Sequence, residues 1–132
     1  REAQLPLDDQ LVFYAGTTLE EGRIAARQLL DEVPDITAIQ AVNDLVAMGA
    51  ALELFSRGQR IPEDCSVAGF GNFLASEYFR VPLTTVRQPK YRLGVAAMDC
   101  LVRLRRGERP EPPRLGAELA VRASTGPPPA GR

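Results

Sequence analysis

Apolar residues occur along this chain both in short continuous runs and in longer stretches with helical spacing. A short, mostly apolar run bounded by glycine, proline or polar residues is typical of a buried strand. Such runs predict five strands, at residues 11–15, 37–42, 65–70, 83–86 and 118–123. The segments between them have the period of helices, and strands that alternate with helices are typical of an α/β fold with a parallel sheet.

Start and stop signals define the first two helices. Thr18 and Glu21 have the spacing of a capping box, and Pro34 ends the helix that follows them. Either Asn43 or Asp44 can cap the second helix by accepting hydrogen bonds from free backbone N–H groups at its first turn. The pattern therefore predicts that each of these helices begins directly after a strand.

The second and third helices carry apolar residues on more than one side. The second has a single charged side chain between residues 45 and 55. The third is predicted over residues 90–106, where Pro89 suits its first turn and Gly107 its end. A helix that is apolar around most of its circumference must be covered on two sides. Because a sheet covers only one side, the pattern predicts a further partner for each helix.

The composition is that of one soluble globular domain, with 132 residues of which 45% are apolar and 25% are charged. The net charge of −1 lacks the basic excess of a nucleic-acid-binding surface. The chain contains no histidine, which removes Ser-His-Asp and Cys-His nucleophile systems and the commonest metal ligand. Cys65 and Cys100 lie in apolar surroundings without the spacing of a disulfide framework or a zinc site, so we expect reduced thiols in the cytoplasm.

The sequence pattern indicates no membrane span, signal peptide or phosphate-binding loop. No apolar run approaches the length of about 18 residues that a membrane span requires. The first ten residues, REAQLPLDDQ, lack the charged and then apolar layout of a signal peptide. We find no GxGxxG or Walker loop, and we predict neither a cofactor nor a bound metal.

Five short motifs follow one another along the chain. They are NDLVAMGA at residues 43–50, RIPED at 60–64, SVAGF at 66–70, PLTTVRQP at 82–89 and VRAST at 121–125. Their order and spacing over residues 38–125 resemble the C-terminal effector-binding region of the lactose-repressor (LacI) family. The resemblance implies an α/β fold with a Rossmann-like parallel sheet, of the periplasmic-binding-protein-like (type I) class. The fold would be incomplete and would consist mostly of the C-terminal subdomain.

The same resemblance implies a division of the chain. Residues 1–88 would form part of the C-terminal effector-binding subdomain, residues 89–109 a helix that crosses to the N-terminal subdomain, and residues 110–125 a return segment with the final strand. The proline-rich tail at residues 126–132 is expected to be disordered. In the family, a helix-turn-helix domain precedes these subdomains and binds DNA, and we expect that domain to be absent from this sequence.

Two candidate ligand-binding residues follow predicted strands, at the sheet edge where α/β proteins bind ligands. Asn43 has two interpretations: it caps the second helix, or it offers a ligand both a donor and an acceptor. The resemblance favours the ligand contact and leaves the cap to Asp44. Gly71 departs from the family, whose sugar- and purine-binding members commonly have aspartate there. It either permits a positive φ or removes repulsion of an anionic ligand.

Three more residues are expected near this edge. Asn72 could act as the acceptor in place of the missing carboxylate, and Phe73 could line the cleft or simply pack. Thr17 occupies the position where several sugar-binding relatives place a stacking aromatic, although its hydroxyl is more readily interpreted as a helix cap with Glu20 three residues on. The sequence GFGN resembles the gluconate-repressor branch and points to a sugar acid.

The resemblance also implies a homodimer. In the family, the helix that corresponds to residues 44–57 lies in the dimer interface, which makes Met48, Leu52 and Phe55 expected interface residues. Phe79 lies where a further interface residue is expected. The helix at residues 90–106 would bury its second apolar face near the dimer partner.

Together these observations predict the effector-binding and dimerisation portion of a cytoplasmic transcriptional regulator and not an enzyme. A sugar or sugar acid would be sensed, and operator DNA would be contacted only through the absent helix-turn-helix domain, under allosteric control. Two alternatives stay open. A periplasmic-type sugar-binding protein shares the fold, and a Rossmann-like nucleotide-binding enzyme is opposed by the lack of a phosphate-binding loop.

Overall fold

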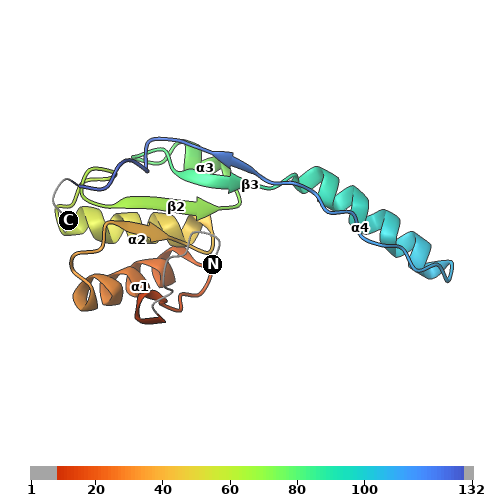
Figure 1. Cartoon of the computed structure of the whole chain (residues 1–132), viewed down its shortest axis with the longest axis horizontal. Helices are drawn as coiled ribbons and strands as arrows, with labels where there is room; N and C mark the ends of the chain where they lie inside the picture. The colour runs from red at the N-terminus through yellow and green to blue at the C-terminus, as the bar shows by residue number, and fades with distance from the viewer. Residues whose placement is uncertain (1–8, 130–132) are drawn as a thin grey trace.

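The computed structural model of the chain describes residues 9–129, and residues 1–8 and 130–132 lie outside the described part. Figure 1 shows a sheet with helices packed below it and one helix extending away from it. In chain order the elements are η1, a 3₁₀ helix (Asp9–Leu11), α1 (Leu19–Glu32), β1 (Ala38–Gln40), α2 (Asp44–Ser56), β2 (Ser66–Phe70), α3 (Leu74–Glu77), β3 (Thr84–Arg87), α4 (Lys90–Arg105) and β4 (Glu118–Ala120).

The sheet has four strands in the order β1-β2-β3-β4. β1 pairs in parallel with β2, and β2 in parallel with β3, so the carboxyl ends of these three strands lie along one edge. β4 pairs with β3 in the antiparallel direction, with Val86 opposite Leu119. The predicted α/β class and the dominance of parallel pairing are therefore confirmed.

α2 is the central element of the fold, because it packs between the sheet and α1. Its residues Val46, Ala47, Ala51 and Leu54 belong to the main core, together with Val67 of β2. The apolar circumference predicted a partner beyond the sheet, and within the chain that partner is α1. The two helices approach closely at glycines. A Cβ atom on Gly49 would collide with the carbonyl oxygen of Leu19.

A buried carboxylate also connects α1 with α2. Glu53 is only 4% exposed, and it receives Arg23 Nε at 3.4 Å, Arg27 Nη2 at 3.4 Å and Arg57 Nε at 3.2 Å. Burial raises the pKa of Glu53, but the hydrogen bonds from Arg27, Arg57 and Arg23 together outweigh it and leave the pKa below its ordinary value. The carboxylate therefore stays charged and cross-links the two helices.

The predicted strand at residues 11–15 is wrong. Residues 9–11 form η1, and residues 12–16 have no regular structure. A strand forms only when its backbone groups find a ladder partner, and β1, the nearest sheet edge, is separated from this segment by a cavity that both of them line. The side chains of Leu11 and Tyr14 accordingly remain 49% and 97% exposed.

The C-terminal segment returns to the sheet and is held there by hydroxyl groups. Ser124 is 1% exposed, and its Oγ accepts from the Thr84 N–H at 2.8 Å and donates to the Val67 carbonyl at 2.6 Å. The Gly126 N–H donates to Ser66 Oγ at 3.1 Å. Gly126, the first residue of the tail that we expect to be disordered, is thus hydrogen-bonded to Ser66, and residues 130–132 of that tail lie outside the described part.

Among the described residues, α4 is the one long helix with no buried residue. Figure 1 shows it extending away from the sheet and from α1 and α2. Its predicted end at glycine is confirmed, since Gly107 has a φ of 81°. Leu93, Met98 and Leu101 are each more than two fifths exposed. Within the described residues, both apolar faces of α4 lack a partner.

Two further sequence expectations concern the cysteines and the membrane. Cys65 is fully buried and Cys100 partly buried, and both are free thiols. Burial raises the pKa of the Cys65 thiol to about 11, which keeps it protonated and unreactive. Over residues 9–129 we find no helix whose length and apolarity would let it cross a membrane.

Candidate functional site at the carboxyl ends of the strands

Asn43 lies directly after β1 and uses both ends of its side-chain amide within the chain. Its Oδ1 accepts from the Val46 N–H at 2.8 Å and caps α2. Its Nδ2 donates to the Thr17 carbonyl oxygen at 3.0 Å. The cap alone is worth about 1 kcal/mol. Asn43 therefore fixes the position of Thr17 beside the strand end, whatever contact it makes with a ligand.

Thr17 directly precedes Thr18, the N-cap of α1, and does not itself cap the helix. The cap of α1 is Thr18, whose hydroxyl accepts from the Glu21 N–H, and Glu21 reaches back to the Thr17 and Thr18 N–H groups at 2.9 Å. The Glu21 carboxylate accepts hydrogen bonds from the Thr18 hydroxyl, the Thr18 N–H and the Thr17 N–H, and these bonds lower its pKa. The predicted Thr18 capping box is confirmed, and the pairing of Thr17 with Glu20 is not the one that forms.

Asp44 does not cap α2, in contrast to its expected role. It is 0% exposed, and its carboxylate accepts from the Phe73 N–H at 2.7 Å and from the Thr85 hydroxyl at 2.5 Å. Because Asn43 already supplies the cap, Asp44 is free to turn inward. Its contacts connect the segment after β1 with the turn after β2 and with β3, since Phe73 follows β2 and Thr85 is the second residue of β3.

Gly71 and Asn72 form the turn after β2, and both have positive φ. The φ of Gly71 is 119°, a conformation that L side chains rarely adopt, and the φ of Asn72 is 51°. The turn accounts for glycine at position 71 without reference to a ligand. A Cβ atom at that position would also lie 3.4 Å from the Phe73 ring.

The Asn72 side chain faces an arginine of this chain. Arg122 Nη2 donates to Asn72 Oδ1 at 2.7 Å, and Arg122 Nη1 donates to the Leu83 carbonyl at 2.7 Å. A weaker ion pair joins Arg122 to Glu77 at 3.7 Å. Asn72 was expected to accept a hydrogen bond from the ligand in place of the missing carboxylate. In this structure its Oδ1 accepts from Arg122 of the same chain instead.

Phe73 is the exposed apolar member of the group, with 38% of its surface accessible. The ammonium group of Lys90, the first residue of α4, lies 4.9 Å from the centre of its ring. This cation–π contact is worth about 0.5 to 1 kcal/mol at an exposed position. It joins the base of α4 directly to the strand-end turn.

The structure thus brings the five expected residues to one edge in two groups. Thr17 and Asn43 are hydrogen-bonded to each other, and Gly71, Asn72 and Phe73 form the turn that Asp44 holds. Three residues of this edge were not singled out from sequence: Asp44 as an anchor, Thr85 and Arg122. Each lies in a motif that the sequence displayed, but the contacts join positions up to 50 residues apart.

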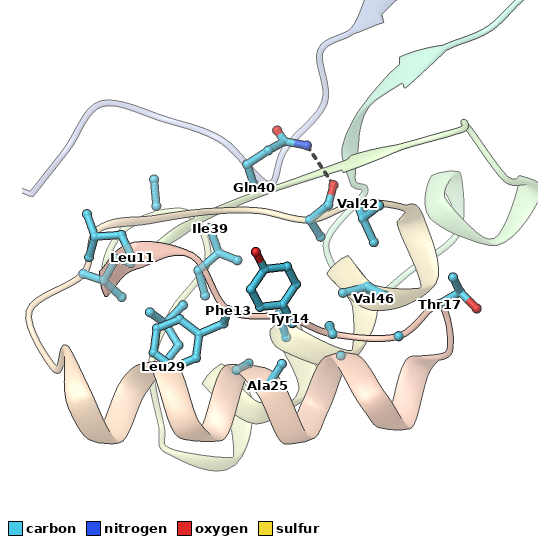
Figure 2. Close-up of a pocket in the computed structure, with 18 residues that line it drawn as sticks. Leu11, Phe13, Tyr14, Thr17, Ala25, Leu29, Ile39, Gln40, Val42 and Val46 are labelled. Carbon is cyan, nitrogen blue, oxygen red and sulfur yellow. Dashed lines mark hydrogen bonds between the residues drawn. The ribbon is translucent and has the colours of Figure 1, made fainter. Parts of the chain in front are cut away.

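A cavity among the described residues lies elsewhere. It has a volume of about 400 Å³ and is formed by residues 11–17, β1 and α1. Figure 2 shows Thr17 at one end of this cavity, with the apolar residues Phe13, Leu29 and Ile39 away from it. Of the five expected residues only Thr17 lines it, so this apolar space and the polar edge are separate features.

The expected dimer residues differ in exposure. Met48 is 3% exposed and is a core residue of its own chain, so it has no surface to offer a partner. Leu52 is 37% exposed. The rings of Phe55 and Phe79 are 6.4 Å apart, and the Arg80 guanidinium lies 4.4 Å from the centre of the Phe55 ring. Within residues 9–129 no cluster of three or more acidic or sulfur ligands could hold a metal.

Comparison with known proteins identifies the family of this chain. The sequence matches the family described as "Periplasmic binding protein-like domain" over residues 1–125. The chain belongs to this family. Among curated relatives, the HTH-type transcriptional regulator CelR of Thermobifida fusca is 38% identical over 124 residues, which are 92% of this chain and 36% of that protein. The repressor CytR of Escherichia coli (strain K12) is 33% identical over 127 residues, 95% of this chain and 37% of CytR.

Solved structures of family members have the same fold. The structure described as "transcriptional regulator CelR-cellobiose complex" superposes with a TM-score of 0.86 at 37% identity, covering 93% of this chain and 38% of the other. A LacI family regulator from Arthrobacter sp. FB24 in complex with lactose gives 0.74 at 34% identity, with 86% and 44% covered. The resemblance to LacI-type regulators is confirmed. The chain spans a little over a third of the length of its curated relatives.

Proposed function

We propose that this member of the periplasmic binding protein-like family is the effector-binding and dimerising portion of a LacI-type transcriptional regulator. The observation that carries the proposal is the polar edge at the carboxyl ends of the parallel strands, where Asn43 meets Thr17 and the turn at residues 71–73 meets the base of α4. Sugars bound by two relatives, cellobiose and lactose, support a sugar or sugar acid as the effector.

The proposed mechanism is a shift between two conformations of the whole regulator. An effector that binds one conformation more tightly moves the population toward it and changes the geometry that the DNA-binding domains receive. Those helix-turn-helix domains would lie outside these 132 residues, and the regulator would act in the cytoplasm. The role is binding, so no catalytic residue or cofactor forms part of the proposal.

Ligand binding is expected to be weak and to depend on Phe73. Because the chain supplies only part of the regulator, we expect a saccharide to bind with a Kd of about 1 mM, roughly 4 kcal/mol. Saturation-transfer NMR of the full chain with cellobiose, lactose, ribose and gluconate measures it, with NAD⁺ as the nucleotide control. Phe73→Ala should weaken binding roughly fivefold, the value of about 1 kcal/mol of ring contact.

Tyr78→Ala is the matched control, since Tyr78 is also an exposed aromatic, at 75%. It should leave the affinity unchanged. Binding of NAD⁺ with no response to any saccharide would favour the nucleotide alternative. A folded chain that binds none of these compounds at 10 mM would contradict the proposal, and a preference for gluconate would support the sugar-acid branch.

We place the homodimer contact on the surface formed by Leu52, Phe55 and Phe79. Sedimentation velocity is expected to show a dimer that Leu52→Glu weakens at least roughly tenfold, because a charge would be buried in an apolar contact. Ile24→Glu is the control, because Ile24 is a comparably exposed aliphatic residue on α1, at 48% against 37%. A monomeric parent chain, or equal effects of the two variants, would place the contact elsewhere.

A further inference from the structure

A second cavity lies at the amino ends of β2 and β3, away from the candidate site. It has a volume of about 240 Å³ and is lined by Phe55 of α2, by residues 58–61 of the turn that follows this helix, and by Arg80 and Val81, which precede β3. In Figure 1 the chain passes from α2 into β2 at the end of the sheet away from α4. None of the five residues expected to bind ligand lines this cavity.

Arg80 gives this cavity a positive charge that no carboxylate of the described residues balances. Its guanidinium lies 4.4 Å from the centre of the Phe55 ring, and within residues 9–129 it forms no ion pair. Arg60, the other arginine of the lining, is paired with Asp64 at 2.8 Å. The cavity therefore has one unbalanced cation, which matches an anion with a single charge.

The side-chain oxygen of Gln59 is buried and has no hydrogen-bond partner among the described residues. Buried polar groups are nearly always paired, so this oxygen calls for a donor that those residues do not supply. The backbone at Gln59 is fixed, since its N–H donates to the Leu54 carbonyl at 3.0 Å. The last side-chain torsion of glutamine is broad, so a rotation about it can turn the oxygen toward the cavity.

The rest of the wall is apolar and large enough to hold a short carbon chain. It consists mainly of the side chains of Phe55, Ile61 and Val81. The volume is more than ten times the roughly 10 to 15 Å³ that one water molecule requires. The carbonyl groups of Leu54 and Phe55 at the end of α2 already accept from backbone N–H groups, at 3.0 and 3.1 Å. They are therefore not free to repel an anion in the cavity.

We propose that this cavity binds a small hydroxy acid with a single carboxylate. The carboxylate contacts the Arg80 guanidinium, whose N–H groups pair well with carboxylate oxygens. The hydroxyl donates to Gln59 Oε1, and the carbon chain lies against Ile61 and Val81. A phosphate or sulfate dianion fits less well, because the cavity has one unbalanced cation and an apolar wall. The inference does not rest on saccharide binding at the carboxyl ends of the strands.

NMR titration of the full chain with matched pairs of acids tests the proposal. The pairs are lactate with propionate and 3-hydroxybutyrate with butyrate, all at constant ionic strength. In at least one pair, the hydroxy acid should shift the Gln59 side-chain amide resonances and bind at least roughly fivefold more tightly than its partner. The partner acid lacks the hydroxyl and leaves the Gln59 oxygen unpaired. Inorganic phosphate is the anion control and should bind more weakly than the hydroxy acid.

Two variants test the two polar contacts separately. Arg80→Gln should weaken binding of the hydroxy acid at least roughly tenfold, because it removes the charged donor. Arg105→Gln is the matched control, since Arg105 is also an exposed arginine but lies on α4, and it should leave binding unchanged. Gln59→Leu should lower the affinity of the hydroxy acid to that of its partner and leave the partner's affinity unchanged. Circular dichroism checks that each variant is folded.

A further variant locates the bound acid within the molecule. Phe73→Ala, which should weaken saccharide binding at the strand ends, should leave the affinity for the hydroxy acid unchanged. A parallel loss in this variant would place the acid at the carboxyl ends and overturn the proposal. So would equal affinities within both pairs of acids, tighter binding of phosphate, or a folded parent chain that binds neither hydroxy acid at 10 mM.

Discussion

Replacing Asp44 by alanine is expected to lower the free energy of unfolding by about 3 kcal/mol. The carboxylate is 0% exposed and is the acceptor for the Phe73 N–H and the Thr85 hydroxyl. Alanine would leave both donors buried without this partner, and each unsatisfied buried group costs about 1 to 3 kcal/mol. Urea unfolding followed by circular dichroism measures the change, because a shifted midpoint at constant slope reports stability directly.

Asp44→Asn separates the loss of the charge from the loss of the hydrogen bonds. The amide oxygen can still accept from the Phe73 N–H, and the amide nitrogen can donate to Thr85 Oγ1, since a hydroxyl both donates and accepts. We therefore expect Asn to cost about 1 kcal/mol, the value of a typical hydrogen bond. If Asn and Ala were equally destabilising, the charge and not the bonding pattern would be the important property of Asp44.

Gly49→Ala is expected to destabilise the fold by about 2 kcal/mol, although alanine is the better helix former. The added Cβ would collide with the Leu19 carbonyl oxygen and lie 2.7 Å from the Arg23 backbone nitrogen, so α1 would have to move away from α2. Overpacking of this kind costs about 1 to 3 kcal/mol or more. Helix propensity returns at most about 1 kcal/mol. The same urea titration gives the difference.

Gly94→Ala is the matched control, because Gly94 is also an interior helix glycine but has nothing within 4 Å of an added Cβ. It should raise the helix content of α4 without lowering stability. A Gly49→Ala protein as stable as the parent chain would show that α1 can shift without loss of packing. The close approach of the two helices would then be incidental to stability.

Local signals were the part of the fold that could be predicted from sequence. The capping box of Thr18 and Glu21 lies within four residues and depends on nothing outside them. The strand predicted at residues 11–15 does not form. An apolar run indicates that a segment can be buried, but a strand also needs a neighbouring strand to pair with, which the run does not reveal. The apolar circumference of α2 correctly predicted a second cover, but the pattern could not identify α1 as that cover.

The candidate site was predicted as a location, and its internal contacts were not. The motif order placed Asn43 and the turn at residues 71–73 near each other through the carboxyl-end rule. Asp44 turns inward to accept from Thr85, which lies 41 residues away, so the local sequence could not show that the cap of α2 is Asn43. Likewise, Asn72 is hydrogen-bonded to Arg122, which lies 50 residues further along the chain. The spacing of residues within a motif cannot indicate a contact between positions so far apart.

Lys90, the first residue of α4, contacts the Phe73 ring, so a small tilt of the helix at this end would move its other end much further. α4 has 16 residues, and at a rise of 1.5 Å per residue it is about 24 Å long. A tilt of about 10° at its base would therefore displace its far end by about 4 Å, by the geometry of a rod of that length. Movements too small to alter the packing of the sheet would thus be amplified into a displacement comparable to the width of a side chain.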